Sequence, residues 1–317
     1  MSTAVQNWQE SQWGQDVTSG VEFILKPLRY RLAGSGAPRF DNALTGETVE
    51  QLDVIILMTR VARFAYDQTE VFKSPYCLSV DGGLHGSPRD FPITPPWLLE
   101  AGAPVCATCD LNRFGTGKID AMGKRRGKAC TEKRALLMLP AVPCEPDDAA
   151  QARAILERFA PQGKQRAAAV ARIAAMSSAE LMRTAAAIWQ PDPDNSLPLL
   201  LNAPVKSLAP VDGFLSGLVY GAMHNPLTGA KTSAVPAYAI ATTLTVTRID
   251  AGKDSYGALT LKAAGWIDPA HAPAIVGQRA KFGPMLGAIL EAAEDDASDP
   301  NGPGNMAEPL DNGEVPF

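Results

Sequence analysis

Apolar residues change their spacing along the chain, and the changes separate predicted strands from predicted helices. Residues 21–32 (VEFILKPLRYRL), 52–66 (LDVIILMTRVARFAY) and 135–140 (ALLMLP) are rich in β-branched and aromatic residues, which is typical of strands. The segment NALTGET between the first two has turn residues. This pattern predicts a β-meander or a small barrel.

From residue 146 the spacing becomes helical and the composition rich in alanine. Residues 146–159, 164–176 and 177–189 repeat apolar positions every three or four residues. The last of these opens with Ser177 and Glu180, the spacing of a capping box, in which each side chain satisfies a backbone amide of the other. We therefore expect a helical insert over about 146–189.

The remaining pattern returns to strands and ends in acidic residues. Strands are predicted at 197–205, 239–249 and 256–267, and helices at 212–222 and from 275, where Gly283 and Pro284 break or kink the second helix. Together these elements predict the α+β class. Residues 1–18 are polar and predict a flexible arm, whereas residues 291–317 have the composition of a disordered tail.

Charge is distributed unevenly along the chain. Its formal net charge is -5, yet the last basic residue is Lys281 and eight acidic residues follow it. The other 26 acidic residues stand against 29 lysines and arginines, so residues 1–281 carry +3. A basic body with an acidic tail favours a polyanion-binding protein with an interaction segment.

Apolar runs of membrane-spanning length are absent from the sequence, and its first residues lack the order of a signal peptide. We therefore expect a cytoplasmic protein with no membrane partner. Cysteines stay reduced in that compartment, so metal binding is favoured over disulfides.

Four of the five cysteines have the spacing of a zinc site. Cys106 and Cys109 form a C-x2-C pair, and Cys77 and Cys130 flank it across 28 and 20 intervening residues. This predicts a subdomain over about 72–134 that holds one structural Zn²⁺, because four thiolates leave no open position for catalysis. Two alternatives are four unrelated buried thiols, or His85 in place of Cys77.

The residues that follow the C-x2-C pair are strongly basic. Residues 113–134 contain eight lysines and arginines against Asp120 and Glu132, a local charge of +6. Aromatic residues also alternate with arginines on two predicted strands, which suits phosphate contact and base stacking. The DNA-contact candidates are Arg29, Tyr30, Arg31, Arg60, Arg63, Phe64, Tyr66, Arg113, Phe114, Lys118, Lys124, Arg125, Arg126 and Lys128. The alternatives are a solvated loop for the charges and core burial for each aromatic.

The sequence offers little for catalysis. None of the three histidines, His85, His224 and His271, lies in a metal-binding helix motif or beside a plausible nucleophile. The basic segments also lack the residues of a phosphate-binding P-loop. We expect no enzymatic activity.

The ending EPLDNGEVPF resembles the C-terminal tip of bacterial and phage single-stranded DNA-binding proteins. The match falls on Asp311, Glu314, Val315, Pro316 and Phe317, and it implies docking of replication and recombination proteins. CATCDLNRFGTG and GKACTEKR are more loosely similar to phage-encoded DNA-binding proteins in which a zinc element is inserted in an OB-type fold. The chain departs from the bacterial type in its greater length, its helical insert and its different N-terminal strand sequence.

The resemblance implies an OB-like β-barrel domain over residues 19–290 that binds single-stranded DNA with little sequence preference. It also implies the host cytoplasm if the chain is phage-encoded, and assembly of copies on DNA. One alternative is a zinc-containing regulator that reads duplex DNA with the helices of 147–189. Another is a metal-dependent nuclease.

Overall fold

The computed structural model describes residues 28–32, 38–42, 45–66, 75–79, 81–117, 119, 122–125, 127–195, 197–221, 223–251, 254–284 and 286. The predicted arm (1–18) and the predicted tail (291–317), with Asp311, Glu314, Val315, Pro316 and Phe317, lie outside these residues. Lys118 and Arg126 of the basic segment also lie outside them.

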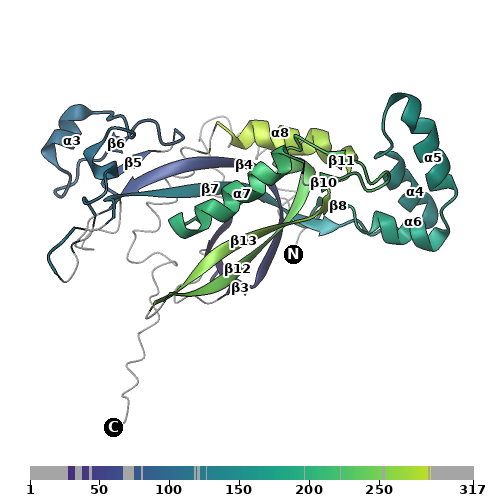
Figure 1. Cartoon of the computed structure of the whole chain (residues 1–317), viewed down its shortest axis with the longest axis horizontal. Coiled ribbons are helices and arrows are strands. Elements are labelled where there is room, and N and C mark those ends of the chain that lie inside the picture. The colour runs from purple at the N-terminus through teal and green to yellow at the C-terminus, as the bar shows by residue number, and fades with distance from the viewer. Residues whose placement is uncertain are drawn as a thin grey trace, which may run out of the picture.

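A large, mainly antiparallel sheet forms the centre of the fold (Figure 1). Its strand order is β13 (Asp254–Trp266), β12 (Ile240–Ala251), β4 (Gln51–Ala65), β7 (Cys130–Pro143), β9 (Leu199–Ala203), β1 (Leu28–Leu32), β2 (Phe40–Asn42) and β3 (Thr48–Val49). The ladder between β1 and β9 is parallel. Smaller pairings attach β5 (Cys77–Ser79) to β4 and to β6 (Ser87–Pro88), and β8 (Trp189–Pro191) to β7, while β10 (Met223–His224) and β11 (Lys231–Thr232) form a separate hairpin.

The sheet of the described residues is an open path from β13 to β3, so these pairings form no closed barrel. Two long central strands extend the sheet beyond its other strands at one end. β4 has 15 residues and β7 has 14, and they run together as a ribbon that continues beyond the strands beside them. β12 pairs with β4 only up to Ile55, and β9 pairs with β7 only between Arg134 and Met138. The remainder of the ribbon carries the cysteine region.

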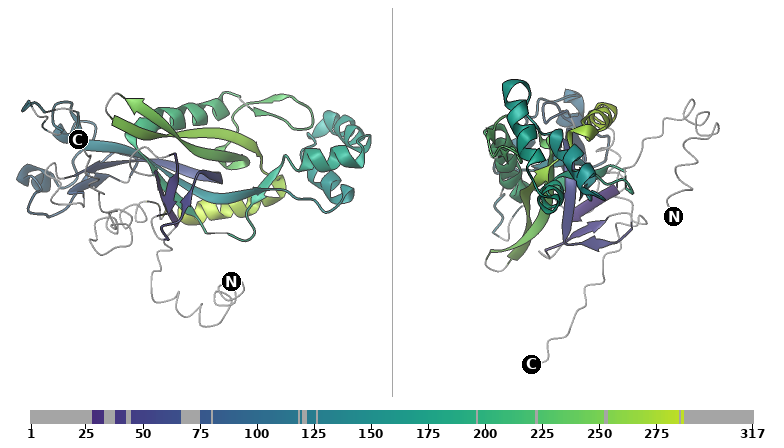
Figure 2. Two further views of the ribbon diagram at one scale, coloured as in Figure 1. Left: turned by 90° about the horizontal axis from the view of Figure 1, so that it is seen from below. Right: turned by 90° about the vertical axis from the view of Figure 1, so that its right-hand side faces the viewer.

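Two helices cover opposite faces of the sheet (Figure 2, left). α7 (Leu208–Val219) packs Val211 against one face, among Leu136, Met138 and Leu201. α8 (Ala272–Phe282) packs Ile275 and Phe282 against the other face. As predicted, this last helix is interrupted at Gly283 and Pro284.

The predicted helical insert is confirmed as three short helices, α4 (Ala149–Glu157), α5 (Arg166–Ala174) and α6 (Ser178–Ala185). The capping box of α6 is present, because Glu180 N–H donates to Ser177 Oγ and Ser177 N–H donates to Glu180 Oε2. These helices bury a core of their own that includes Cys144. Arg158 fastens them to the body by donating from Nε to the buried Asp268, 2.7 Å from Oδ1.

α4, α5 and α6 lie at one end of the long axis of the molecule (Figure 1). α3 (Pro96–Ala101), β5 and β6 lie at the other end, with the cysteine region. Five short 3-10 helices complete the described chain: η2 (Asp110–Asn112), η3 (Gly163–Gln165), η4 (Val205–Ser207), η5 (Ala237–Ala239) and η6 (Pro269–His271). Within the described ranges, no helix is both long and apolar enough to span a bilayer.

Candidate nucleic-acid interface and cysteine cluster

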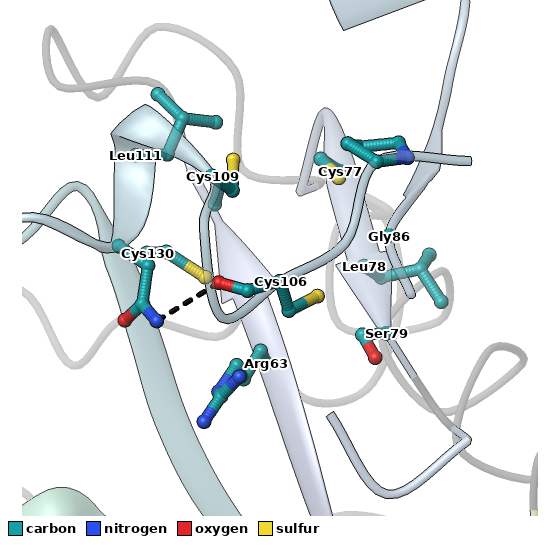
Figure 3. Close-up of a pocket in the computed structure, with 12 residues that line it drawn as sticks. Arg63, Cys77, Leu78, Ser79, Gly86, Cys106, Cys109, Leu111 and Cys130 are labelled. Atoms are coloured by element: carbon teal, nitrogen blue, oxygen red, sulfur yellow. Dashed lines mark hydrogen bonds between the residues drawn. The ribbon is translucent and has the colours of Figure 1, made fainter. Parts of the chain in front are cut away.

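The four cysteines of the predicted zinc site line one small cavity (Figure 3). Cys77 begins β5 and Cys130 begins β7, and both pair with Ala65, the last residue of β4. Residues that oppose one another in an antiparallel ladder point to the same face. The sheet therefore places these two thiols on one face, with only the small side chain of Ala65 between them.

A folded loop brings Cys106 and Cys109 to the same cavity. Cys106 N–H donates to Leu84 O at 2.9 Å, and Gly86 N–H donates to Pro104 O at 2.8 Å. The Asn112 side chain donates from Nδ2 to Cys106 O at 2.9 Å, the dashed line of Figure 3. These bonds fix the C-x2-C turn opposite the two strand cysteines.

Gly86 packs directly against the cluster. A Cβ at this position would lie 2.9 Å from Cys77 Sγ and 3.1 Å from Pro104 Cγ. Both distances are shorter than ordinary carbon contacts, so a side chain here displaces either the thiol or the loop. The backbone of residue 86 thus forms part of the wall that positions Cys77.

The electrostatics of the cavity show that the thiols are close neighbours. Burial, together with the neighbouring Cys130, Cys106 and Cys109, raises the pKa of Cys77 to about 12. Burial also raises the pKa of Cys130 to about 12, while the charges of Arg63 and Lys128 oppose that rise. A cation beside these thiols would lower their pKa values and favour the thiolate forms.

The cavity measures about 10 Å³, close to the space that one water or one ion occupies. As placed, however, no three His, Cys, Asp or Glu side chains of the described chain converge closely enough to ligate an ion. The four cysteines therefore share one cavity wall without forming a ligand cluster as they stand. His85 does not line the cavity. Its Nδ1 instead contacts Asp81 Oδ2 at 3.1 Å.

Arg63, predicted to contact DNA, is engaged inside the protein. Its Nη2 and Nε donate to Glu132 Oε2 at 3.0 and 3.2 Å, and its Nη1 donates to Gly83 O at 2.8 Å. The side chain is only 20% exposed and borders the cysteine cavity. Its guanidinium thus joins the 81–86 loop to β7, and its contact with DNA stays a prediction.

The prediction that Phe64 stacks on DNA bases is wrong, because its ring is fully buried and packs in the core on the α8 side of the sheet. The ladder between β4 and β7 shifts register between Ile56 and Met58, and this bulge changes which residues of β4 point to each face. Tyr66 is half-buried 6.2 Å from the Phe64 ring, and its hydroxyl accepts a hydrogen bond from Lys133 Nζ at 2.9 Å.

Two further strand candidates, Tyr30 and Arg60, are less exposed than the basic segment. Tyr30 and Arg60 are half-buried, and Tyr30 packs against the core on the α7 side. Arg29 and Arg31 lie on β1, and their side chains are outside the described part of the structure.

The basic segment between Cys109 and Cys130 presents its candidates to solvent. Arg113, Lys124, Arg125 and Lys128 are exposed, and Phe114 is 82% exposed. Three backbone N–H groups, of Gly115, Thr116 and Gly117, donate to Gly127 O, the nearest at 2.7 Å. The segment therefore folds back on itself between its two cysteine ends.

A groove of about 440 Å³ lies beside this segment. Its lining comes from three parts of the chain: the basic segment with Phe114, Gly127 and Lys128, the start of β7 from Cys130 to Glu132, and Val205 of η4 with Leu208 of α7. Sequence reasoning missed Val205 and Leu208, because they lie at and just beyond the end of a predicted strand, about 75 residues further along the chain, and carry no local signal of binding.

A scan against protein-family models finds no match, and searches among curated proteins and among solved structures find no similar chain. Function is therefore inferred from the residues and their arrangement.

Proposed function

We propose that this protein binds single-stranded DNA with little sequence preference and catalyses no reaction. The observation that carries the proposal is the exposed basic segment, in which Arg113, Lys124, Arg125 and Lys128 are exposed together with the ring of Phe114. Phosphate neutralisation by lysine and arginine supplies sequence-independent affinity, and an aromatic ring stacks on any base. The open sheet differs from the expected barrel, so the proposal rests on this surface and not on a fold.

We also propose that Cys77, Cys106, Cys109 and Cys130 hold one structural Zn²⁺. Bound zinc would supply the positive charge that these buried thiols lack and would tie three chain segments together. Arg63 is placed to offset the excess negative charge of four thiolates, since it borders the cavity. The ion would hold both ends of the basic segment at fixed positions.

The partner proposal rests on the tail, which lies outside the described residues. By the resemblance of its ending, the segment that closes with Val315, Pro316 and Phe317 docks replication or recombination proteins. Phe317 would enter an apolar pocket of the partner, while Asp311 and Glu314 meet basic residues there. Several copies would assemble on one DNA strand.

The electrostatic proposal is tested by a triple replacement, Lys124→Ala, Arg125→Ala and Lys128→Ala. The measurement is the affinity for a labelled oligothymidine across a salt series. Each lost phosphate contact on a single strand reduces the slope of log K against log salt by about 0.7, so three contacts reduce it by about 2.

The matched control replaces three exposed arginines by alanine. These are Arg153, Arg172 and Arg183 on α4, α5 and α6, at the other end of the molecule. We expect this control to keep the slope of the wild type. An unchanged slope in the basic-segment variant would contradict the proposal. A slope lowered only in the control would move the binding surface to α4, α5 and α6, as the duplex-reading alternative requires.

A further inference from the structure

The groove beside the basic segment has the construction of a site for a flat ligand. Phe114 and Val205 are large apolar side chains that are 82% and 51% exposed, and both line this one groove with Leu208. Its volume of about 440 Å³ lies in the range of small-molecule sites, roughly 300 to 1,000 Å³. We propose that this groove receives one unpaired nucleobase of the bound strand, which rests on the proposed function and adds a specific base site to it.

The charges of the groove decide which part of a nucleotide enters it. Lys128 lies on the Phe114 side, with Nζ 5.5 Å from the ring centroid. Glu132 lines the groove from β7, and its carboxylate, which is paired with Arg63, offers no attraction for a phosphate. The sugar-phosphate backbone therefore follows the lysine side, and the uncharged base is the part that enters.

The walls provide stacking on one side and polar groups on another. A base that stacks on Phe114 and also contacts Val205 or Leu208 buries apolar surface in this groove. Glu132 of β7 also lines the groove, and its carboxylate is a hydrogen-bond acceptor for a base edge. β9 pairs with β7 only from Arg134 onward. Residues 130–132 of β7 therefore have no pairing with β9, and they line the groove instead.

The cysteine region keeps the groove in shape. Glu132 is held by two hydrogen bonds from Arg63, and Arg63 also binds the loop that faces Cys106. Lys128 is held by a 3.1 Å hydrogen bond from Nζ to Asn112 Oδ1, and the Asn112 amide binds Cys106 O. Both polar sides of the base site thus depend on the segments that carry the four thiols.

The test compares two oligonucleotides of equal length and charge, an oligothymidine and the same backbone with stable abasic residues. Five variants are measured: Phe114→Ala, Phe114→Trp and Val205→Gln in the groove, and the controls Tyr220→Ala and Val219→Gln. Tyr220 and Val219 match the groove residues in exposure, at 80% and 52%, and neither lines the groove.

We expect Phe114→Ala to weaken oligothymidine binding by about 5-fold to 150-fold, as the loss of one stacked base does. Val205→Gln should weaken it as well, and Phe114→Trp should restore it. Abasic binding should be unchanged in every variant, and both control variants should behave as the wild type.

Two negative results separate the two proposals. If the wild type binds oligothymidine in a salt-dependent manner while the groove variants bind it equally well, the base site is wrong and the proposed function stands. If the wild type binds neither oligonucleotide, the proposed function fails and the base site fails with it.

Discussion

Replacing Gly86 by alanine tests whether the cysteine cluster is built as the structure indicates. The added Cβ would lie 2.9 Å from Cys77 Sγ and 3.1 Å from Pro104 Cγ. Such overpacking of a well-packed site costs about 1–3 kcal/mol of the free energy of unfolding. Gly277→Ala is the matched control, because its Cβ would have no neighbour within 4 Å and it replaces a glycine inside helix α8.

The control removes the general effect of replacing glycine by alanine, which stabilises by about 0.4–1 kcal/mol where the backbone permits it. The two variants should therefore differ by at least the steric cost. For a chain of this length about 1 kcal/mol corresponds to about 2 °C, so Gly86→Ala should melt about 2–6 °C below the control.

Two assays check this prediction, thermal unfolding and competition for zinc with a chelator. Because the strain falls on Cys77, zinc affinity should decrease by about 5-fold to 150-fold, equivalent to about 1–3 kcal/mol. Equal melting temperatures and equal zinc affinity in both variants would refute the packing of Gly86 against the thiol.

Three further predictions concern the metal, the helical segment and the tail. Metal analysis of the purified protein should find one zinc per chain, and Cys106→Ser should lower that content; wild-type protein without zinc would remove the metal proposal. Asp268→Ala should cost about 1–3 kcal/mol of stability, less than a fully buried pair because its arginine partner is 37% exposed, whereas Asp250→Ala in an exposed pair should change stability by under about 1 kcal/mol. Equal unfolding free energies for the two variants would contradict the anchoring role of Asp268. Deleting residues 308–317 should abolish partner capture and leave or raise DNA affinity; a large loss of affinity would count against a tail that binds partners.

Local patterns in the sequence were sufficient for the helical segment and for the cysteine cluster. The capping box at Ser177 and Glu180 is a short-range signal, and its two hydrogen bonds are present. The spacing of the four cysteines likewise predicted that they gather, and the structure places all four on one cavity. The capping box can be predicted because its two residues are three positions apart. The cysteine cluster can be predicted because thiols are metal ligands wherever they lie in the sequence.

Features that depend on distant pairing were beyond local patterns. Arg63 was expected to face DNA because its neighbours are basic and aromatic, yet its partner Glu132 is 69 residues away. Phe64 was expected to be accessible, and a bulge near Met58 sets the face to which it points. The Val205 and Leu208 wall meets the basic segment only through the β7–β9 pairing, so the groove emerges from the topology.

The most direct measurement of the central claim is a titration of labelled oligothymidine and of a duplex of equal length by fluorescence anisotropy, each at two salt concentrations. The account predicts tight binding to the single strand that weakens with salt, and much weaker binding to the duplex. Preference for the duplex, or no binding to either DNA, would contradict it.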